Sequence, residues 1–282
     1  MAKANRFSSR LWSVVMTLIC VLWMYPIFMA LMISLKQPTA ISTATAFELP
    51  NADTFAGFVN YENAINQQGF FSSLFYSVLI TVTSVFAILI FCSMFAWYIT
   101  RVHTRFTKLL YGLCAFSMVV PFQMVMFTLS KTADQLNLNT PWNICIIYLG
   151  FGAGLAVFMF TGFMKSVPME IEEAAMIDGC SEMKAMWKVM IPMASPGIIT
   201  VTIFNFMNIW NEYFMALIFA NGNDKIRTLS MGLQNMITSM KYTGDWAGLF
   251  AGVIIVLVPT LILYLLLSEK IVAGITGGAV KG

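Results

Sequence analysis

Charge is scarce in this chain. Of its 282 residues only 10% are charged, whereas 59% are hydrophobic, and the mean hydropathy is +0.79. Average soluble domains carry about 25% charged residues, so the composition excludes an ordinary soluble domain and is typical of a polytopic membrane protein. The net charge of +3 gives no electrostatic support for nucleic-acid binding, which depends on neutralising many phosphates.

Catalytic and metal-binding signals are missing as well. His103 is the only histidine, and nothing beside it in the sequence supports a Ser-His-Asp triad or a His-ligated metal. The five cysteines contain no C-x-x-C pair, which argues against a disulfide framework or a zinc site. The chain also has no G-x-x-x-x-G-K-[ST] sequence, the P-loop that binds ATP. We therefore expect no catalytic residues, no metal and no cofactor held by this chain.

The chain does have six long apolar segments, each able to span a hydrocarbon core of about 30 Å as a helix. They cover residues 11–35, 70–99, 109–130, 142–164, 193–220 and 246–267. The first is too long for a signal-peptide core and has no small-residue cleavage site, so we expect it to be retained. Residues 36–69 and 221–245 are predicted to be external segments, the former irregular. Whether residues 36–69 are a linker or contact a partner stays open.

The distribution of Lys and Arg orients these six segments. The stretches that flank the six segments lie on alternating sides of the membrane. This alternation places eleven of the sixteen basic residues on one side and five on the other. The eleven are Lys3, Arg6, Arg10, Arg101, Arg105, Lys108, Lys165, Lys184, Lys188, Lys270 and Lys281. Since cytoplasmic loops carry the excess of basic residues, both termini and the loop at residues 165–192 are predicted to face the cytoplasm.

This cytoplasmic loop has the sequence signals of two short helices joined by a turn. Ser166 is a candidate N-cap of the first helix, and Gly179 suits the left-handed residue that ends it. Ser181 is a candidate cap of the second helix, and Pro192 is expected to close it. The second helix has an apolar stripe at helical spacing, formed by Met183, Met186, Trp187, Met190 and Ile191.

The same loop resembles the EAA loop of ABC-importer permeases, whose pattern is E-A-A-x3-G-x9-I-x-L-P. Val189 and Ile191 replace the Ile and Leu of that pattern, and both changes are conservative. The resemblance implies an all-α, MetI-like ABC permease fold and a cytoplasmic coupling helix that docks on a separate ATPase. The implied coupling residues are Glu173, Ala174, Ala175, Asp178, Gly179 and Pro192. The alternative is an amphipathic loop that only lies on the membrane.

The C-terminal sequence carries a second resemblance. Residues 274–282 read G-I-T-G-G-A-V-K-G, which is similar to the G-x-T-x-G-A-V-K-G ending of maltose-type sugar permeases. In that branch the tail reaches the ATPase dimer; the alternative is a frayed glycine-rich terminus. We divide the chain into an N-terminal part (1–69), a permease core (70–267) and a cytoplasmic tail (268–282).

The fifth apolar segment carries unusual polar residues. Asn205, Asn208, Asn211 and Glu212 fall within an arc of about 120° on a helix. A carboxylate inside a bilayer costs about 2.5 kcal/mol or more, so it usually faces a cavity or a partner. Trp210-Asn211-Glu212 resembles the W-N-[DE] of sugar permeases. These residues, with Gln123 as a weaker candidate, either line a substrate path or join helices through hydrogen bonds of about 0.6 kcal/mol each.

Together these features predict a permease subunit of a prokaryotic ABC importer that moves a sugar by alternating access. The resemblance implies a cytoplasmic ATPase dimer, an extracytoplasmic sugar-binding protein and a second permease subunit, taken by analogy to be a different chain. Two alternatives remain: an ABC importer of another solute, such as a polyamine or amino acid, and a secondary transporter. Glu212 alone is a thin basis for ion coupling. The sequence does not name the sugar.

Overall fold

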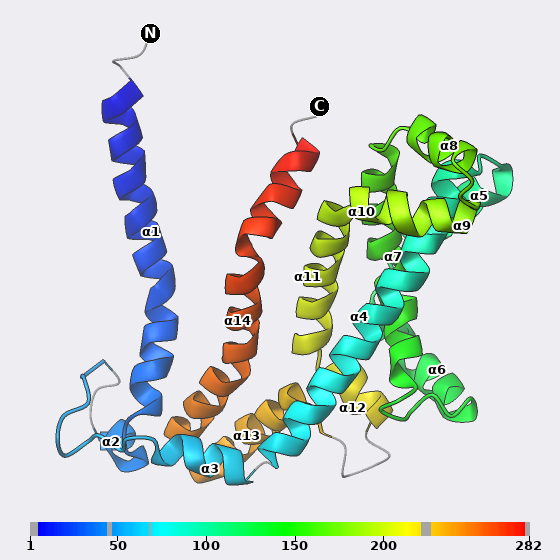
Figure 1. The fold of residues 1–282 in the computed structure, drawn as a ribbon. Coiled ribbons are helices and arrows are strands. Elements are labelled where there is room, and N and C mark those ends of the chain that lie inside the picture. Colours follow the sequence, from blue (N-terminus) through cyan, green and yellow to red (C-terminus); the bar gives the residue numbers. More distant parts are fainter. Residues whose placement is uncertain (1–4, 44–46, 68, 221–226, 280–282) are drawn as a thin grey trace. The chain divides into compact units, whose positions relative to one another are not determined.

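The computed structural model describes residues 5–43, 47–67, 69–220 and 227–279, and nearly all of them lie in helices (Figure 1). Within these ranges the β-structure consists of an isolated bridge between Lys36 and Phe55. The all-α prediction is therefore confirmed. The chain divides into two units, one made of residues 1–70 and 232–259 and the other of residues 71–231 and 260–282.

Unit 1 contains α1 (Asn5–Ser34), α2 (Pro38–Thr43), α3 (Val59–Gln67), most of α13 (Leu229–Thr243) and the start of α14 (Trp246–Ala279). The prediction of an irregular segment at 36–69 is wrong, since α2 and α3 form within it. The buried Asn60 amide donates to the carbonyls of Ser34 and Lys36, both at 2.8 Å. Tyr61 adds a hydroxyl contact to Ser34 at 2.6 Å, so α3 is fixed to the end of α1.

Unit 2 holds the elements that build the candidate site. Its long helices are α4 (Phe70–Arg101) and α7 (Ile144–Lys165), close to their predicted bounds. The shorter ones are α5 (Arg105–Ser117), α6 (Phe122–Gln135), α8 (Met169–Ile177), α9 (Glu182–Ala185), α10 (Ile191–Met193), α11 (Ser195–Asn211) and α12 (Phe214–Ala220). The apolar core consists mainly of buried side chains of α4 and α7, among them Ile88, Val157 and Phe160.

The third and fifth predicted helices are each broken. In place of a helix at 109–130, α5 and α6 meet at 107°. Pro121 lies at this bend; its ring fixes φ and removes the backbone donor, and it disfavours helical geometry in the residue before it. In place of a helix at 193–220, the helical run Glu182–Met193 meets α11 at 77°, and α11 ends before α12 begins.

Four helical stretches in the described residues are long and apolar enough to cross a membrane. They are Arg10–Ser34, Phe70–Arg101, Ile144–Lys165 and Trp246–Leu266. The number rises to six if each bent pair forms one span, which agrees with the predicted number of segments. The described part of α14 reaches Ala279, beyond the predicted start of the tail at 268. Residues 1–4, 221–226 and 280–282 of the predicted termini and second external segment lie outside the described residues.

Candidate functional site: a coupling loop and a polar pocket

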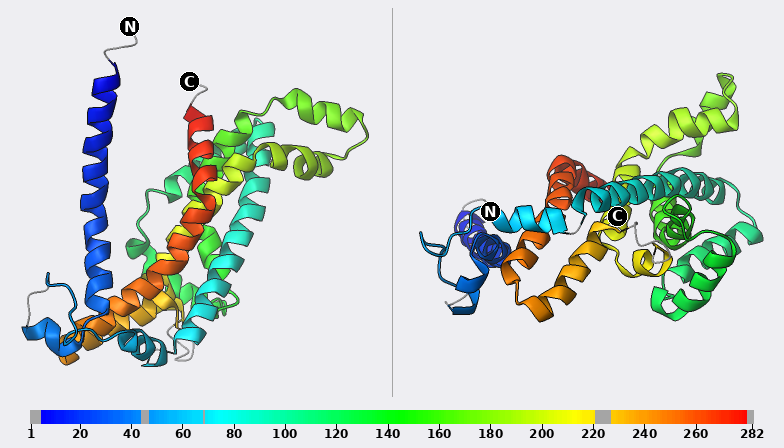
Figure 2. Two further views of the ribbon diagram at one scale, coloured as in Figure 1. Left: turned by 60° about the vertical axis from the view of Figure 1, so that its left-hand side comes forward. Right: turned by 90° about the horizontal axis from the view of Figure 1, so that it is seen from below.

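Two regions of unit 2 carry the predicted functional residues. Figures 1 and 2 show α5 and α8–α10 at one end of this unit and α6 and α12 at the other. The first region is the loop made by α8–α10. The second is a pocket lined by residues of α5, α7, α11 and α12 and of the short segments that follow α5 and α11.

The turn after α8 has the predicted geometry. Gly179 has φ +90°, and its N–H donates to the carbonyl of Met176 at 3.0 Å. The N–H of Cys180 donates to the carbonyl of Ala175 at 3.0 Å. This pair of bonds is a Schellman motif, which satisfies the last carbonyls of a helix and favours glycine at the left-handed position. The prediction that Gly179 ends the first helix is confirmed.

The helix ends around this turn differ from the prediction. Ser166 follows the last residue of α7, and its hydroxyl donates to the carbonyl of Phe163 at 2.7 Å, so it does not cap α8. Pro168 occupies the N-cap position of α8 instead; the missing N–H of proline costs nothing there, because the first helical donors have no intrahelical partner. Ser181 is the N-cap of α9 without a side-chain bond. Pro192 lies inside α10 and does not close the helix, which ends at Met193.

The predicted apolar stripe of the second helix is split. Residues Met186–Met190 form a π-helix between α9 and α10. Because a π turn holds more residues than an α turn, it changes the face on which the following side chains lie. Met186 and Met190 are completely buried, whereas Met183 and Trp187 are exposed. The second helix therefore anchors the loop through two methionines and leaves two large apolar side chains outside.

The outer surface of α8 carries the residues of the EAA pattern. Glu173, Ala174, Asp178 and Gly179 are exposed, and Ala175 is half-buried. Next to them Ile177 has an exposed fraction of 86%. An aliphatic side chain so fully presented, beside the exposed Met176, Met183 and Trp187 of the same loop, is typical of a surface that binds a protein partner.

Beneath this surface lies an ion pair that the sequence reasoning missed. Glu172 is 4% exposed and forms a salt bridge with Arg101, the last residue of α4. Its carboxylate also accepts a hydrogen bond from the indole N–H of Trp97 at 2.7 Å. The sequence analysis used Arg101 only as one of the basic residues that orient the segments, and the EAA pattern begins one residue after Glu172. In a chain with so few charges, an Arg at the end of a membrane helix suggests that it has an acidic partner, but the sequence does not identify that partner as Glu172.

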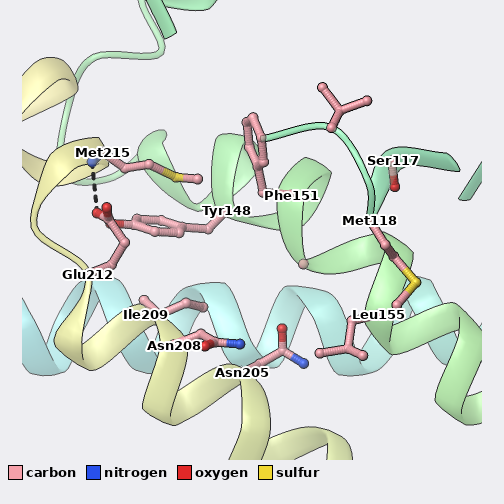
Figure 3. Close-up of a pocket in the computed structure, with 12 residues that line it drawn as sticks. Ser117, Met118, Tyr148, Phe151, Leu155, Asn205, Asn208, Ile209, Glu212 and Met215 are labelled. Atoms are coloured by element: carbon pink, nitrogen blue, oxygen red, sulfur yellow. Dashed lines mark hydrogen bonds between the residues drawn. The ribbon is translucent and has the colours of Figure 1, made fainter. Parts of the chain in front are cut away.

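The pocket has a volume of about 320 Å³ and contains three of the five candidate path residues (Figure 3). Asn205, Asn208 and Glu212 line it, while Asn211 and Gln123 are exposed outside its lining. The remaining lining residues are Ser117, Met118, Val120, Tyr148, Phe151, Gly152, Leu155, Ile209 and Met215. The pocket is thus mostly apolar with a few hydroxyl, amide and carboxylate groups, as is usual for small-molecule sites.

Glu212 is held at a break in the chain and not on a helix as predicted. It follows the last residue of α11 with extended backbone (φ −71°, ψ 131°). One carboxylate oxygen accepts from the N–H groups of Met215 at 2.8 Å and Ala216 at 3.2 Å, and from the hydroxyl of Tyr148 at 3.2 Å. An acid that binds the first N–H groups of a helix also interacts favourably with its dipole. The carboxylate is therefore stabilised by the first N–H groups of α12 and by Tyr148.

Asn205 and Asn208 differ although both reach the pocket. Asn205 is buried, and its amide donates to the carbonyl of Val201 at 2.9 Å. A β-carbon on Gly152 would lie 2.8 Å from its Oδ1 atom, so the side chain fits because residue 152 is glycine. Asn208 is exposed at the pocket. Asn208 is thus better placed to contact a solute, and Asn205 is mainly a packing residue.

Comparison with known proteins decides the family. Residues 64–268 match the model of the binding-protein-dependent transport system inner membrane component. This chain belongs to that family. A probable starch degradation products transport permease of Thermoanaerobacterium thermosulfurigenes is 32% identical to it over 92% of both chains. A multiple sugar-binding transport permease of Streptococcus mutans is 30% identical over 95% of both.

A solved structure supports the fold independently. A chain of a bacterial ABC transporter that imports the acidic polysaccharide alginate superposes with a TM-score of 0.81, at 22% identity, over 95% of this chain and 98% of that one. The predictions of an ABC-importer permease, a permease fold and a multi-pass membrane protein are confirmed.

Proposed function

We propose that this chain is a transmembrane permease subunit of an ABC importer that brings a sugar or oligosaccharide into the cell. The carrying observation is the coupling loop: α8 ends in a Schellman turn and exposes Glu173, Asp178 and Ile177. A rigid helix with an apolar residue at its exposed end is suited to dock on a partner. The partner is a separate ATPase dimer, which binds and hydrolyses the ATP, so this chain is not itself an enzyme.

Carbohydrate as the transported class rests on the relatives and on the pocket. The two relatives named above are permeases of starch-product and sugar transport systems. The pocket offers the amide of Asn208 and the hydroxyl of Ser117 beside apolar and aromatic side chains, a combination that can exchange hydrogen bonds with sugar hydroxyls and pack on a sugar ring. An extracytoplasmic binding protein would deliver the sugar, and a second permease subunit, a different chain, would complete the path.

Transport would follow alternating access. ATP binding closes the ATPase dimer, the coupling loop moves with it, and the path opens toward the binding protein; hydrolysis resets it. Both termini and the loop at 165–192 face the cytoplasm in this proposal. Cysteine labels at residues 104 and 178 should react only from the cytoplasm, and a label at 135 only from outside. External labelling at 178 would contradict the orientation.

The test of function is uptake into proteoliposomes that hold this chain with its partner permease, ATPase and binding protein. We expect uptake of one or more radiolabelled sugars from a panel, only with binding protein outside and ATP at the ATPase face. Uptake of polyamines or amino acids in place of sugars would favour another ABC importer. Uptake that persists without ATP and follows an ion gradient would identify a secondary transporter.

A further inference from the structure

Arg101, at the end of α4, contacts three other segments of unit 2. Its Nε atom donates to Glu172 Oε1 of α8 at 2.6 Å. Its Nη2 atom donates to the carbonyl of Val167 at 3.2 Å and approaches the sulfur of Met190 at 3.7 Å. One guanidinium group therefore connects the end of α4 to the residues after α7, to α8 and to the π-helix.

The pair is withdrawn from water on both sides. The side-chain exposures are 14% for Arg101 and 6% for Glu172. Trp97 satisfies the second carboxylate oxygen at 2.7 Å, so both oxygens of Glu172 have partners. A buried ion pair of this kind is weak support for stability, because the cost of desolvation offsets the attraction, but it fixes a defined geometry. Glu182 is the other charged residue in the lining of the adjacent cavity of about 260 Å³.

The helix that carries Arg101 continues far from the loop. α4 extends for 32 residues, and near its other end the hydroxyl of Ser77 accepts from the N–H of Leu229 at 2.8 Å. Between these points its side chains fill the core of unit 2. Because a long packed helix moves as a rigid element, a displacement of its Arg101 end would be transmitted along it.

We propose that Arg101 and Glu172 are positioning residues for transport: they fasten the coupling helix α8 to α4, so that movement of the ATPase displaces α4 and is not absorbed within the loop. This inference rests on the proposed function. Neither residue contacts the solute or ATP in this scheme. Loss of the pair would leave a complex that hydrolyses ATP and docks its ATPase but imports less sugar for each ATP.

The experiment uses the complete importer in proteoliposomes and measures sugar imported per ATP hydrolysed, together with ATPase co-purification. The variants are Glu172→Gln and the double variant Arg101→Met with Glu172→Gln. The double variant removes both charges and keeps an acceptor for the indole of Trp97. Glu170→Gln is the matched control, since Glu170 is an exposed acid in the first turn of the same helix.

We expect the single variant to be poorly assembled, because a buried guanidinium loses its counter-charge. The double variant should recover normal amounts of complex with bound ATPase, yet import about 2- to 30-fold less sugar per ATP, the range typical of altered coupling. Glu170→Gln should match the parent protein. A purely structural pair would lower the amount of complex and leave the ratio unchanged.

Two results would overturn the inference. One is a double variant with the parent ratio of sugar to ATP. The other is a double variant that fails to assemble, which would assign the pair to folding alone. Failure of the proposed function is distinguishable, because then the unmodified importer would itself show no ATP-dependent sugar uptake.

Discussion

Replacement of Gly179 tests the coupling surface most directly. At φ +90° a residue with a β-carbon is strained by roughly 1–2 kcal/mol. A β-carbon built at this position meets nothing within 4 Å among the described residues, so the first atom of a side chain at 179 has room. Since domains are stable by about 5–15 kcal/mol, the variant should still fold and insert. Any larger effect must come from contact with the docked ATPase or from a changed turn.

Gly244 provides a matched control. It has φ +68° and equally open surroundings, but it belongs to the turn between α13 and α14 and is not part of the coupling loop. We expect Gly179→Leu to reduce ATPase co-purification and sugar uptake at least tenfold, which corresponds to about 1.4 kcal/mol of lost binding. Gly244→Leu should keep both. The reasoning is refuted if Gly179→Leu imports sugar normally, or if both variants lose uptake equally, because backbone strain alone would then explain the loss.

Three further predictions concern the pocket. Asn208→Ala should lower uptake at subsaturating sugar about 2- to 10-fold by removing one hydrogen bond, while Asn211→Ala, on the same helix but outside the lining, should leave uptake unchanged; equal effects would contradict a path at this pocket. Glu212→Gln should keep most uptake because the amide oxygen can still cap α12. Glu212→Ala removes the cap, which costs about 1 kcal/mol of stability, and should reduce the amount of assembled complex. Loss of all transport in Glu212→Gln would favour ion coupling. Gly152→Val should destabilise the permease by about 1–3 kcal/mol through overpacking. Gly150→Ala should not, because a β-carbon at this position of the same helix has no neighbour within 4 Å. Thermal unfolding in detergent measures the stability of both variants.

The sequence predicted the features that depend on residues close together in the chain, such as helix length and the turn at Gly179. The apolar segments predicted α4 and α7 because helix length and apolarity are dictated by the bilayer. Gly179 was predicted to be left-handed because a turn between two helices favours glycine there. The coupling role of the EAA residues stays a prediction; the structure shows that Glu173, Asp178 and Gly179 are exposed, as docking on a partner would require.

Tertiary contacts decided the rest. Residues 205–220 contain neither proline nor glycine, so no local signal predicted a break at Glu212. The break is stabilised by Tyr148, which lies 64 residues earlier, and by the carboxylate cap on α12. Arg101 and Glu172 are 71 residues apart, and no periodicity within either helix reports such a pairing. Three members of the predicted arc, Asn205, Asn208 and Glu212, do line the pocket, whereas Asn211 is exposed outside the lining although it still belongs to α11.

The pocket and the coupling loop are physically connected through α4. Ile88 lies thirteen residues before Arg101, about 20 Å along the helix at 1.5 Å per residue. A β-carbon on Gly152 would lie 2.5 Å from the Cδ1 atom of Ile88 and 2.8 Å from Oδ1 of Asn205, so α4, α7 and α11 meet at this glycine without spare room. Because packed interiors do not yield freely, we expect a shift of α4 to displace Gly152 and Asn205, both of which line the pocket. A movement that begins at the coupling loop would thus change the shape of the cavity by repacking one three-helix contact.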